Sequence, residues 1–475
     1  MTNITFGTDG WRGIIADDFT FRNLDTVSRA TLRWLRRQHG DAPRAVVGYD
    51  TRFMGRQFAE YVARVLASQE VTVMLADAFT PTQAVSWATK AYEANVGVVI
   101  TASHNPPEYN GFKLKADFGG SAPPEMVSAV QGELPRLGGD AVAPPGLERM
   151  QAEGRIERRP VTDDFLDYLR GRLDLEAIRS SGLLVVHDAM YGSGQGLLSR
   201  LIGEDRVEEI RSTWNPGFDG EAPEPIERNL AGLARAVIDR GAAAGLANDG
   251  DADRVGMYDE RGRFVDSHTI VALLVKYLHT EQHLSGLVVK TVSTTSLIDR
   301  MAAAYGLPLE TTPIGFKYIA SRIVEEDVLV GGEESGGIAV KGHIPERDGL
   351  YIGLLILEMM AKRRRKLSEL VEELHDEFGP HVCRRIDLHT TEARKQNVLK
   401  RLREEGGLAE IAGEPVHELD TLDGFKHLVD GGWLLVRPSG TEPVLRIYSE
   451  AASGDRADAL IRDAAEQLGV ADESA

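Results

Sequence analysis

Short apolar, β-branched runs alternate with amphipathic helical patterns along most of this chain, and this alternation constrains the fold more than any other sequence feature. Such alternation is typical of layered α/β architecture. Strands are predicted at residues 45–49, 97–101, 183–187, 244–247, 287–290 and 328–330, and helices at 23–38, 55–68, 82–91, 229–241, 268–279 and 351–378. Most of the strand-like runs end in a loop with Gly, Asp or Ser. Ligands of open α/β sheets bind at the carboxyl ends of strands, so the chemistry is expected in these loops.

Three segments share a loose plan of strand, helix and second strand ending in a polar loop. They cover residues 1–150, 151–262 and 263–378. A glycine- and proline-rich stretch at 138–146 marks the first boundary, and Gly379-Pro380 ends a helix. The remaining residues, 379–475, hold two helical patterns and a pair of strands. We therefore expect three α/β domains followed by a smaller C-terminal α+β domain.

Length and charge exclude several classes of protein. A chain of 475 residues suggests three or four domains at ~150 residues each. With 54 Lys and Arg against 73 Asp and Glu, the net charge of -19 argues against non-specific nucleic-acid binding. The single cysteine, Cys383, forms neither an intramolecular disulfide nor a Cys-based zinc site, which fits a reducing cytosol. The start of the chain lacks a signal-peptide pattern, and the apolar run at 351–361 is too short to cross a bilayer. A cytoplasmic protein without a membrane partner is expected.

The first candidate loop spans residues 101–113 and follows the apolar run 96–100. Ser103 is followed by His, Asn and a proline break, so it is expected in a constrained, exposed position. The segment does not match the G-x-S-x-G elbow, and His104 is too close in sequence to act as a triad base. Lys113 could return over the same site and supply positive charge. The alternative is a plain turn at a strand end.

The second candidate loop contains three alternating carboxylates, Asp249, Asp251 and Asp253. Their mutual repulsion destabilises the loop unless a cation lies among them, and oxygen ligands favour Mg²⁺ or Ca²⁺ over zinc. An EF-hand requires glycine where this chain has Arg254, and the flanks resemble strands. The loop is therefore predicted to bind a metal, with Arg254 suited to a phosphate; a solvated acidic turn is the alternative.

The third candidate loop is the glycine-rich segment 331–337, which we call the sugar loop. Its Glu333 and Ser335 could hydrogen-bond to sugar hydroxyls, although an acidic turn without a partner explains the motif equally well. His343 follows as a group that could titrate near neutral pH, but a lone histidine is more often structural.

The fourth candidate loop, Arg-Pro-Ser-Gly-Thr-Glu-Pro at 437–443, lies between two predicted strands, with Arg446 on the second. Arginine, two hydroxyls and exposed backbone N–H groups form an anion nest suited to phosphate. A plain hairpin turn is the alternative.

Two further motifs do not predict function. The glycine-rich segment 192–196 lacks the next glycine of a dinucleotide loop, because Leu197 stands there. The basic run 362–366 is predicted to be the solvated face of one long amphipathic helix.

Together with Phe-Gly-Thr-Asp-Gly-Trp-Arg-Gly at 6–13, the four loops in this order resemble the α-D-phosphohexomutase superfamily, in its phosphoglucomutase and phosphomannomutase branch. The resemblance covers essentially the whole chain. It implies three related α/β domains and a smaller C-terminal domain around a central cleft. It also implies an isomerase that converts glucose 1-phosphate to glucose 6-phosphate through a phosphoserine and a hexose 1,6-bisphosphate, which also serves as activator.

The resemblance carries over to individual residues. It implies that the phosphorylated residue is Ser103 and that one Mg²⁺ is bound by Ser103, Asp249, Asp251 and Asp253. It assigns sugar hydroxyls to Glu333 and Ser335. It assigns the non-reacting phosphate to Arg437, Ser439, Gly440, Thr441 and Arg446. Groups near the reacting atoms are Arg12, His104, Lys113, Arg254 and Lys290. For proton transfer the candidates are Lys113 and His343.

Substrate choice stays open between several hexose phosphates. Many bacterial mannose/glucose mutases carry histidine where this chain has Gly337, and the later position of His343 is more similar to glucose-type enzymes. Glucose phosphate is therefore expected, with mannose phosphate as a further substrate, in a monomer or homodimer. A phosphoglucosamine mutase is the nearest alternative. A metal-dependent phosphatase would instead release phosphate, and a sugar-phosphate sensor would not need all of these loops.

Overall fold

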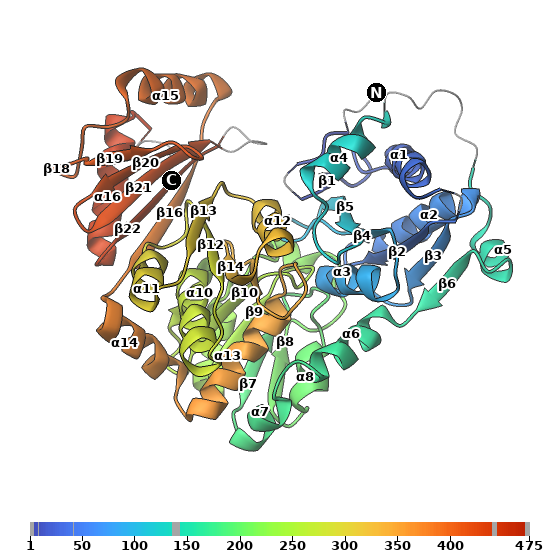
Figure 1. Cartoon of the computed structure of the whole chain (residues 1–475), viewed down its shortest axis with the longest axis horizontal. Coiled ribbons are helices and arrows are strands. Elements are labelled where there is room, and N and C mark those ends of the chain that lie inside the picture. The colour runs from blue at the N-terminus through green and yellow to red at the C-terminus, as the bar shows by residue number, and fades with distance from the viewer. Residues whose placement is uncertain (1–3, 8, 41, 135–142, 439–443, 471–475) are drawn as a thin grey trace.

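The computed structural model describes residues 4–7, 9–40, 42–134, 143–438 and 444–470 as four units, each built around its own sheet (Figure 1). The expected fold class of three α/β units and a smaller C-terminal α+β unit is confirmed. Among the described helices, none combines the length and apolar character that crossing a bilayer requires.

The first sheet has the order β1-β5-β4-β2-β3-β6 and positions the serine loop. Its strands are β1 (Trp11–Ile14), β2 (Arg44–Tyr49), β3 (Thr72–Ala76), β4 (Val96–Ile100), β5 (Tyr109–Ala116) and β6 (Ile156–Arg159). Its helices are α1 (Phe21–His39), α2 (Gly55–Leu66), α3 (Thr82–Ala91), α4 (Pro124–Gln131) and α5 (Leu147–Ala152). β5 returns antiparallel to β4, which sets Lys113 opposite Val99. Because β6 pairs with β3, this sheet extends past the boundary expected at residue 150.

The second sheet has the order β11-β10-β9-β7-β8 and positions the acidic loop. Its strands are β7 (Val185–Asp188), β8 (Val207–Ile210), β9 (Ala244–Asn248), β10 (Val255–Asp259) and β11 (Phe264–Val265). Its helices are α6 (Val161–Arg170), α7 (Leu175–Ser181), α8 (Leu197–Ile202) and α9 (Ala231–Arg240). Asn248 pairs with Val255 across antiparallel β9 and β10, so residues 249–254 form the connecting loop, which we call the metal loop.

The third sheet has the order β13-β12-β14-β15, and its last two strands flank the sugar loop. Its strands are β12 (Leu287–Thr291), β13 (Leu309–Thr312), β14 (Val328–Gly332) and β15 (Ile338–Val340). The helices of this unit are α10 (Ser267–Lys276), α11 (Leu297–Tyr305), α12 (Phe316–Glu325), α13 (Gly349–Arg363) and α14 (Leu367–Phe378).

The helix expected over 351–378 is two helices, which corrects the sequence analysis. Arg364 has a left-handed backbone (φ 52°) that ends α13, and α14 begins at Leu367. The basic run 362–366 therefore lies across a break between two helices, not on the face of one.

The C-terminal unit is an antiparallel sheet of order β16-β22-β21-β20-β19. Its strands are β16 (Val382–His389), β19 (Glu418–Asp420), β20 (Phe425–Val429), β21 (Gly432–Pro438) and β22 (Val444–Ala451), with a small pair β17 (Glu410–Ile411) and β18 (Glu414–Pro415). Its helices are α15 (Glu392–Glu405) and α16 (Gly454–Gln467). On this sheet Trp433 and Tyr448 join a small apolar cluster with Val292 and Ile314 of the third unit.

The first three units share one continuous apolar core. It includes Val85 of α3, Phe165 of α6, Leu246 of β9 and Ile356 of α13. α13 lies so close to the second sheet that a Cβ on Gly353 would lie 1.9 Å from Leu246 Cδ1. The loops at the ends of β4, β9 and β14 are therefore fixed relative to one another by shared packing.

Candidate active site

Ser103 lies just beyond the end of β4 with a left-handed backbone (φ 52°), and it is buried, which corrects the expectation of an exposed position. Its Oγ donates a hydrogen bond of 2.7 Å to Asp249 Oδ2, and His104 Nδ1 lies 3.3 Å from Ser103 Oγ. A non-glycine residue in this backbone region is uncommon and is held there by its surroundings. The structure thus brings the predicted serine to the predicted metal loop.

Arg52, which the sequence analysis missed, holds the serine loop in this conformation. Its buried guanidinium donates hydrogen bonds to the backbone carbonyl oxygens of Ser103, Asn105, Pro106 and Tyr109. Asp50, 3.2 Å from Arg52 Nε, balances the charge. The local sequence around Arg52 gives no signal of this role, because all four acceptors are backbone atoms more than fifty residues away.

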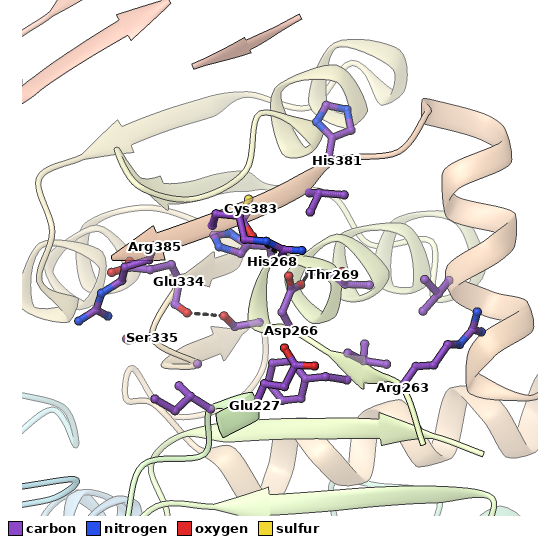
Figure 2. A pocket seen from close by; sticks show the side chains of 18 of the residues that line it. Glu227, Arg263, Asp266, His268, Thr269, Glu334, Ser335, His381, Cys383 and Arg385 are labelled. Carbon is purple, nitrogen blue, oxygen red and sulfur yellow. Dashed lines mark hydrogen bonds between the residues drawn. The ribbon is translucent and has the colours of Figure 1, made fainter. Parts of the chain in front are cut away.

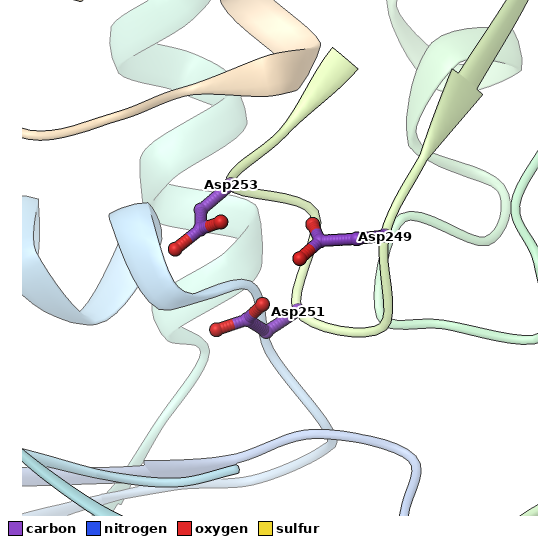
Figure 3. A group of neighbouring side chains, drawn as sticks. All are labelled: Asp249, Asp251 and Asp253. Atoms are coloured by element: carbon purple, nitrogen blue, oxygen red, sulfur yellow. The ribbon is translucent and has the colours of Figure 1, made fainter. Parts of the chain in front are cut away.

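The three aspartates of the metal loop face one another in a buried cluster (Figure 3). Each offers one carboxylate oxygen, and these atoms lie within 4.8 Å of one another. Burial, with the charges of Asp253 and Asp251, raises the pKa of Asp249 well above its usual value, and burial also raises that of Asp253. Asp251 Oδ1 and Asp253 Oδ1 are buried without a hydrogen-bond partner. Buried oxygens left unpaired are costly, so this donor set fits a hard divalent cation.

Glycines let the neighbouring loops approach this cluster. A Cβ on Gly250 would lie 2.5 Å from the carbonyl oxygen of Ser103. A Cβ on Gly192 would lie 2.6 Å from the carbonyl oxygen of Asp249, and Ser193 N donates to Gly250 O at 2.9 Å. The segment 192–196 therefore supports the metal loop by packing.

Lys113 returns on β5 beside the aspartates, as the sequence analysis expected. Its Nζ lies 2.9 Å from Asp251 Oδ2 and 2.8 Å from Asp9 Oδ2. Burial alone would lower the pKa of the Lys113 amine, but the Asp251, Asp9 and Asp253 carboxylates outweigh it and raise the pKa above its usual value. Lys113 is therefore an ammonium that offsets part of the negative charge.

Positive charge converges on the serine from several loops. Arg12 of β1 donates to Asn105 Oδ1, and Arg254 lies at the end of the metal loop with NH1 3.3 Å from Glu224. Burial lowers the pKa of His104 well below its usual value, and nearby cations add to the effect: Arg254, Arg12, Lys113 and Arg347. The His104 ring is therefore neutral, and the cations around it provide charge suited to a phosphate.

The sugar loop is joined to the metal loop through backbone and side chain. Arg254 and Gly337 form an isolated antiparallel bridge. Arg347, missed as a site residue, places its NH2 2.6 Å from Asp9 and 2.7 Å from Asp253, and its NH1 3.8 Å from Glu333. A Cβ on Gly337 would lie 2.3 Å from Arg347 Cδ, so the arginine fills the space beside this glycine.

Glu333 is buried next to this arginine and accepts a hydrogen bond of 3.0 Å from Gly315 N. Burial raises the pKa of the Glu333 carboxyl to about 7, although Arg347 opposes the shift. The other predicted sugar ligand, Ser335, lines a cavity of about 710 Å³ between the second, third and C-terminal units (Figure 2). Glu334 and Arg385 lie on the same wall.

Two predicted residues lie elsewhere. Lys290 donates to Thr295 O at 3.1 Å and forms an ion pair with Asp299, and no contact in the described chain joins it to the serine and aspartates. His343 Nε2 lies 2.8 Å from Asp348 Oδ2, and its ring stacks on Tyr351 with centroids 4.0 Å apart. The buried His343 ring is thus packed among these side chains, and no direct contact in the described chain joins it to the serine and aspartates.

The predicted phosphate loop is described only at its edges. Arg437 and Arg446 lie directly opposite each other on β21 and β22. Arg437 Nε is 3.0 Å from Asp423 Oδ2, and Arg446 Nε is 3.8 Å from Asp387 Oδ1. The remaining predicted ligands, Ser439, Gly440 and Thr441, lie outside the described residues.

Comparisons with known proteins match all four units. The phosphoglucomutase/phosphomannomutase families match as α/β/α domain I over residues 3–137, domain II over 163–262, domain III over 266–378 and the C-terminal domain over 389–467. A phosphoglucomutase/phosphomannomutase from Thermococcus kodakarensis is 34% identical over 456 residues, which cover 95% of each chain. A phosphoglucosamine mutase from Carboxydothermus hydrogenoformans is 30% identical over 462 residues, covering 96% of this chain and 97% of the relative.

A solved structure from Thermus thermophilus, assigned by name as a phosphomannomutase, superposes with a TM-score of 0.87 at 34% identity and covers 99% of this chain and 100% of that one. The full-length matches in sequence and in structure thus indicate the same family as the arrangement of the serine, metal and sugar loops. The chain therefore belongs to the phosphoglucomutase/phosphomannomutase family of the α-D-phosphohexomutase superfamily, and it is a phosphohexomutase isomerase.

Proposed function

We propose that this chain interconverts glucose 1-phosphate and glucose 6-phosphate through a phosphorylated Ser103 and glucose 1,6-bisphosphate. The observation that carries the proposal is the hydrogen bond of 2.7 Å from Ser103 to Asp249, within a cluster of acids and surrounding cations. A phosphate on Ser103 would meet both the metal loop and the cations of Arg12, Lys113 and Arg254. Phosphoryl transfer depends mainly on such positioning and charge stabilisation.

The donor set of the metal loop fits Mg²⁺. Asp249, Asp251 and Asp253 would hold the ion together with the phosphoserine, and the unpaired Oδ1 atoms of Asp251 and Asp253 support this assignment. When bound, the ion would neutralise negative charge on the transferred phosphoryl group and on the leaving Ser103 oxygen.

In the first transfer, the 6-hydroxyl of glucose 1-phosphate attacks the phosphorus on Ser103. The new P–O6 bond forms as the P–Oγ bond breaks. The hydroxyl proton passes from O6 to water, Ser103 Oγ takes a proton from the Lys113 ammonium, and water then returns a proton to Lys113. Lys113 is our candidate for the proton donor, because its raised pKa keeps it an ammonium. An ammonium has no lone pair with which to accept a proton, so Lys113 acts as a proton donor and as a positive charge.

The bisphosphate then turns over, and its 1-phosphoryl group returns to Ser103, which releases glucose 6-phosphate. Both orientations place the non-reacting phosphate at Arg437 and Arg446 and the sugar hydroxyls at Glu333 and Ser335. Two contacts of Arg347 support this model: Arg347 pairs with Asp253 of the metal loop and with Glu333 of the sugar loop. The two loops are therefore held in one arrangement, and the bisphosphate would contact the same residues in both orientations.

Glucose is our preferred sugar. Arg347 fills the space beside Gly337, so this chain has no room for the histidine found there in many mannose/glucose mutases. The position of His343 no longer contributes, because that ring is packed on Tyr351. Glucosamine phosphate is the second candidate, since one full-length relative at 30% identity is a phosphoglucosamine mutase.

A direct assay tests the proposal. Purified protein is incubated with glucose 1-phosphate, mannose 1-phosphate or glucosamine 1-phosphate, with Mg²⁺ and the matching bisphosphate. We expect the highest kcat/KM with glucose 1-phosphate and no net release of inorganic phosphate. A higher kcat/KM with glucosamine 1-phosphate would select the second candidate, and net phosphate release would indicate a phosphatase.

A further inference from the structure

We propose that Asp423 is a positioning residue that orients Arg437 toward the non-reacting phosphate and connects this arginine to the sugar loop. The inference rests on the proposed function of Arg437 in phosphate binding. Asp423 lies in the turn between β19 and β20, away from the serine and metal loops in sequence.

Asp423 contacts one end of the Arg437 guanidinium. Its Oδ2 lies 3.0 Å from Nε, and the two side chains are 23% and 15% exposed. Among the described residues, no acceptor binds the terminal nitrogens of Arg437. The contact is an ion pair without hydrogen-bond geometry, because Nε has no hydrogen-bond partner among the described residues. The carboxylate attracts the guanidinium by charge, and the NH1 and NH2 groups remain free to pair with a phosphate.

The backbone at Gly424 makes this contact reachable. Gly424 has a φ of 111°, and a Cβ there would lie 2.6 Å from Val436 O and 3.3 Å from Arg437 Cβ. Only glycine lets the turn lie this close to β21. The Asp423-Gly424 pair therefore sets the carboxylate against the arginine.

The same carboxylate oxygen reaches across to the third unit. Asp423 Oδ2 accepts a hydrogen bond of 2.9 Å from Ile314 N. The next residue, Gly315, donates its N–H to Glu333 Oε1 at 3.0 Å. The contacts thus run from Arg437 through Asp423 and the 314–315 backbone to Glu333, linking the proposed phosphate ligand to the proposed sugar ligand.

This arrangement has a kinetic consequence. The non-reacting phosphate is held equally in the ground state and in the transition state, so loosening Arg437 should raise KM and leave kcat nearly unchanged. Asp423→Asn keeps an oxygen for Ile314 N but loses the charge beside Arg437. With partial exposure screening the pair, KM for glucose 1-phosphate should rise about 3- to 10-fold.

A double-mutant cycle tests whether Asp423 acts through Arg437. We would measure kcat and KM for glucose 1-phosphate, at saturating Mg²⁺ and bisphosphate, in wild type, Asp423→Asn, Arg437→Ala and the double variant. If Asp423 acts through Arg437, the double variant should match Arg437→Ala. Asp430→Asn is the matched control, because that carboxylate is 87% exposed on the neighbouring turn and pairs only with His417 among the described residues.

A second readout does not depend on activity. Asp423→Ala removes the acceptor of Ile314 N, so hydrogen exchange in a peptide covering residues 312–318 should become faster than in Asp423→Asn. Three outcomes would overturn the proposal. The effects of the two substitutions could be additive in the cycle, or KM could be unchanged in Asp423→Asn. KM could also fall in Asp423→Asn, which would mean that the Asp423 carboxylate competes with the phosphate for Arg437. An unchanged KM in Arg437→Ala would instead contradict the phosphate-binding role on which it rests.

Discussion

The hydroxyl of Ser103 hydrogen-bonds to Asp249 although the two residues are 146 positions apart in the chain. The contact exists because β4 and β9 contribute to one shared core, and because Gly250 lets the metal loop approach the Ser103 carbonyl. One oxygen on Ser103 can therefore lie within reach of a metal ligand and of His104.

Ser103→Ala should lower kcat for the mutase reaction by roughly three orders of magnitude or more, while the protein stays folded. The removed hydroxyl makes hydrogen-bonding contacts only with Asp249 and His104 among the described residues, so little stability is lost. Steady-state assays and thermal melting measure the two effects, and phosphosite mapping by mass spectrometry should find the phosphate on Ser103 in wild type. Ser180→Ala, an exposed serine on α7, is the control. Wild-type protein phosphorylated on a different residue would contradict the assignment.

Asp251→Asn should lower the apparent Mg²⁺ affinity at least ~10-fold, since even groups outside the ligand set change metal affinity by ~10- to 100-fold. The same change weakens the ion pair with Lys113, so the rate should fall even at saturating metal. Mg²⁺ titrations of activity, with isothermal titration calorimetry as a readout of binding alone, measure this. Ca²⁺ should bind but support little turnover, because its looser geometry positions the phosphoryl group poorly.

The control for this variant is Asp239→Asn, an exposed carboxylate on α9 in the same unit. It should leave the Mg²⁺ titration unchanged. Full activity of Asp251→Asn without added metal would remove the case for a metal site in this loop.

The ionisation of Glu333 should make kcat/KM depend on pH, as one limb of the pH profile. Its raised pKa of about 7 means that the carboxyl is protonated below this pH and ionised above it. The ionised carboxylate accepts hydrogen bonds from sugar hydroxyls more strongly, so kcat/KM should rise with pH through about 7. Glu333→Gln should have a lower kcat/KM at pH 8 and should lose this limb, whereas an unchanged limb would assign it to another group.

The loops that carry the chemistry were predictable from sequence because each directly follows a strand. Ser103 follows β4 and the metal loop follows β9, so apolar runs ending in polar residues located both. The presence of Arg254 where an EF-hand has glycine also correctly excluded an EF-hand, since the loop is flanked by strands and not by helices.

The partners of these loops were not predictable, because they come from distant segments. Arg347 stood in a motif near the sugar loop, yet its pairing with Asp9 and Asp253 depends on how three units pack. The stacking of His343 on Tyr351 likewise depends on the path of α13. The break at Arg364 left no signal, because an arginine, not Gly or Asn, adopts the left-handed conformation there.

Arg437→Ala should reduce kcat/KM by ~10- to 150-fold, the effect of losing ~1.5–3 kcal/mol from a charged hydrogen bond. Arg437 lies on β21 of the C-terminal unit, and no contact in the described chain joins it to Ser103. The variant should therefore keep its phosphoserine as long as glucose 1,6-bisphosphate is present. Because the non-reacting phosphate is held less firmly, the bisphosphate intermediate should escape more often during its turn.

Escape of the intermediate leaves the enzyme without its phosphate, so Arg437→Ala should depend more on added bisphosphate than wild type does. Steady-state rates with and without glucose 1,6-bisphosphate, together with phosphoserine occupancy by mass spectrometry, separate weak binding from impaired chemistry. Arg403→Ala is the control, since this exposed arginine lies on α15 of the same unit. If Arg437→Ala left kcat/KM unchanged, or removed the phosphate from Ser103 with the activator present, Arg437 would not be the residue that holds the non-reacting phosphate.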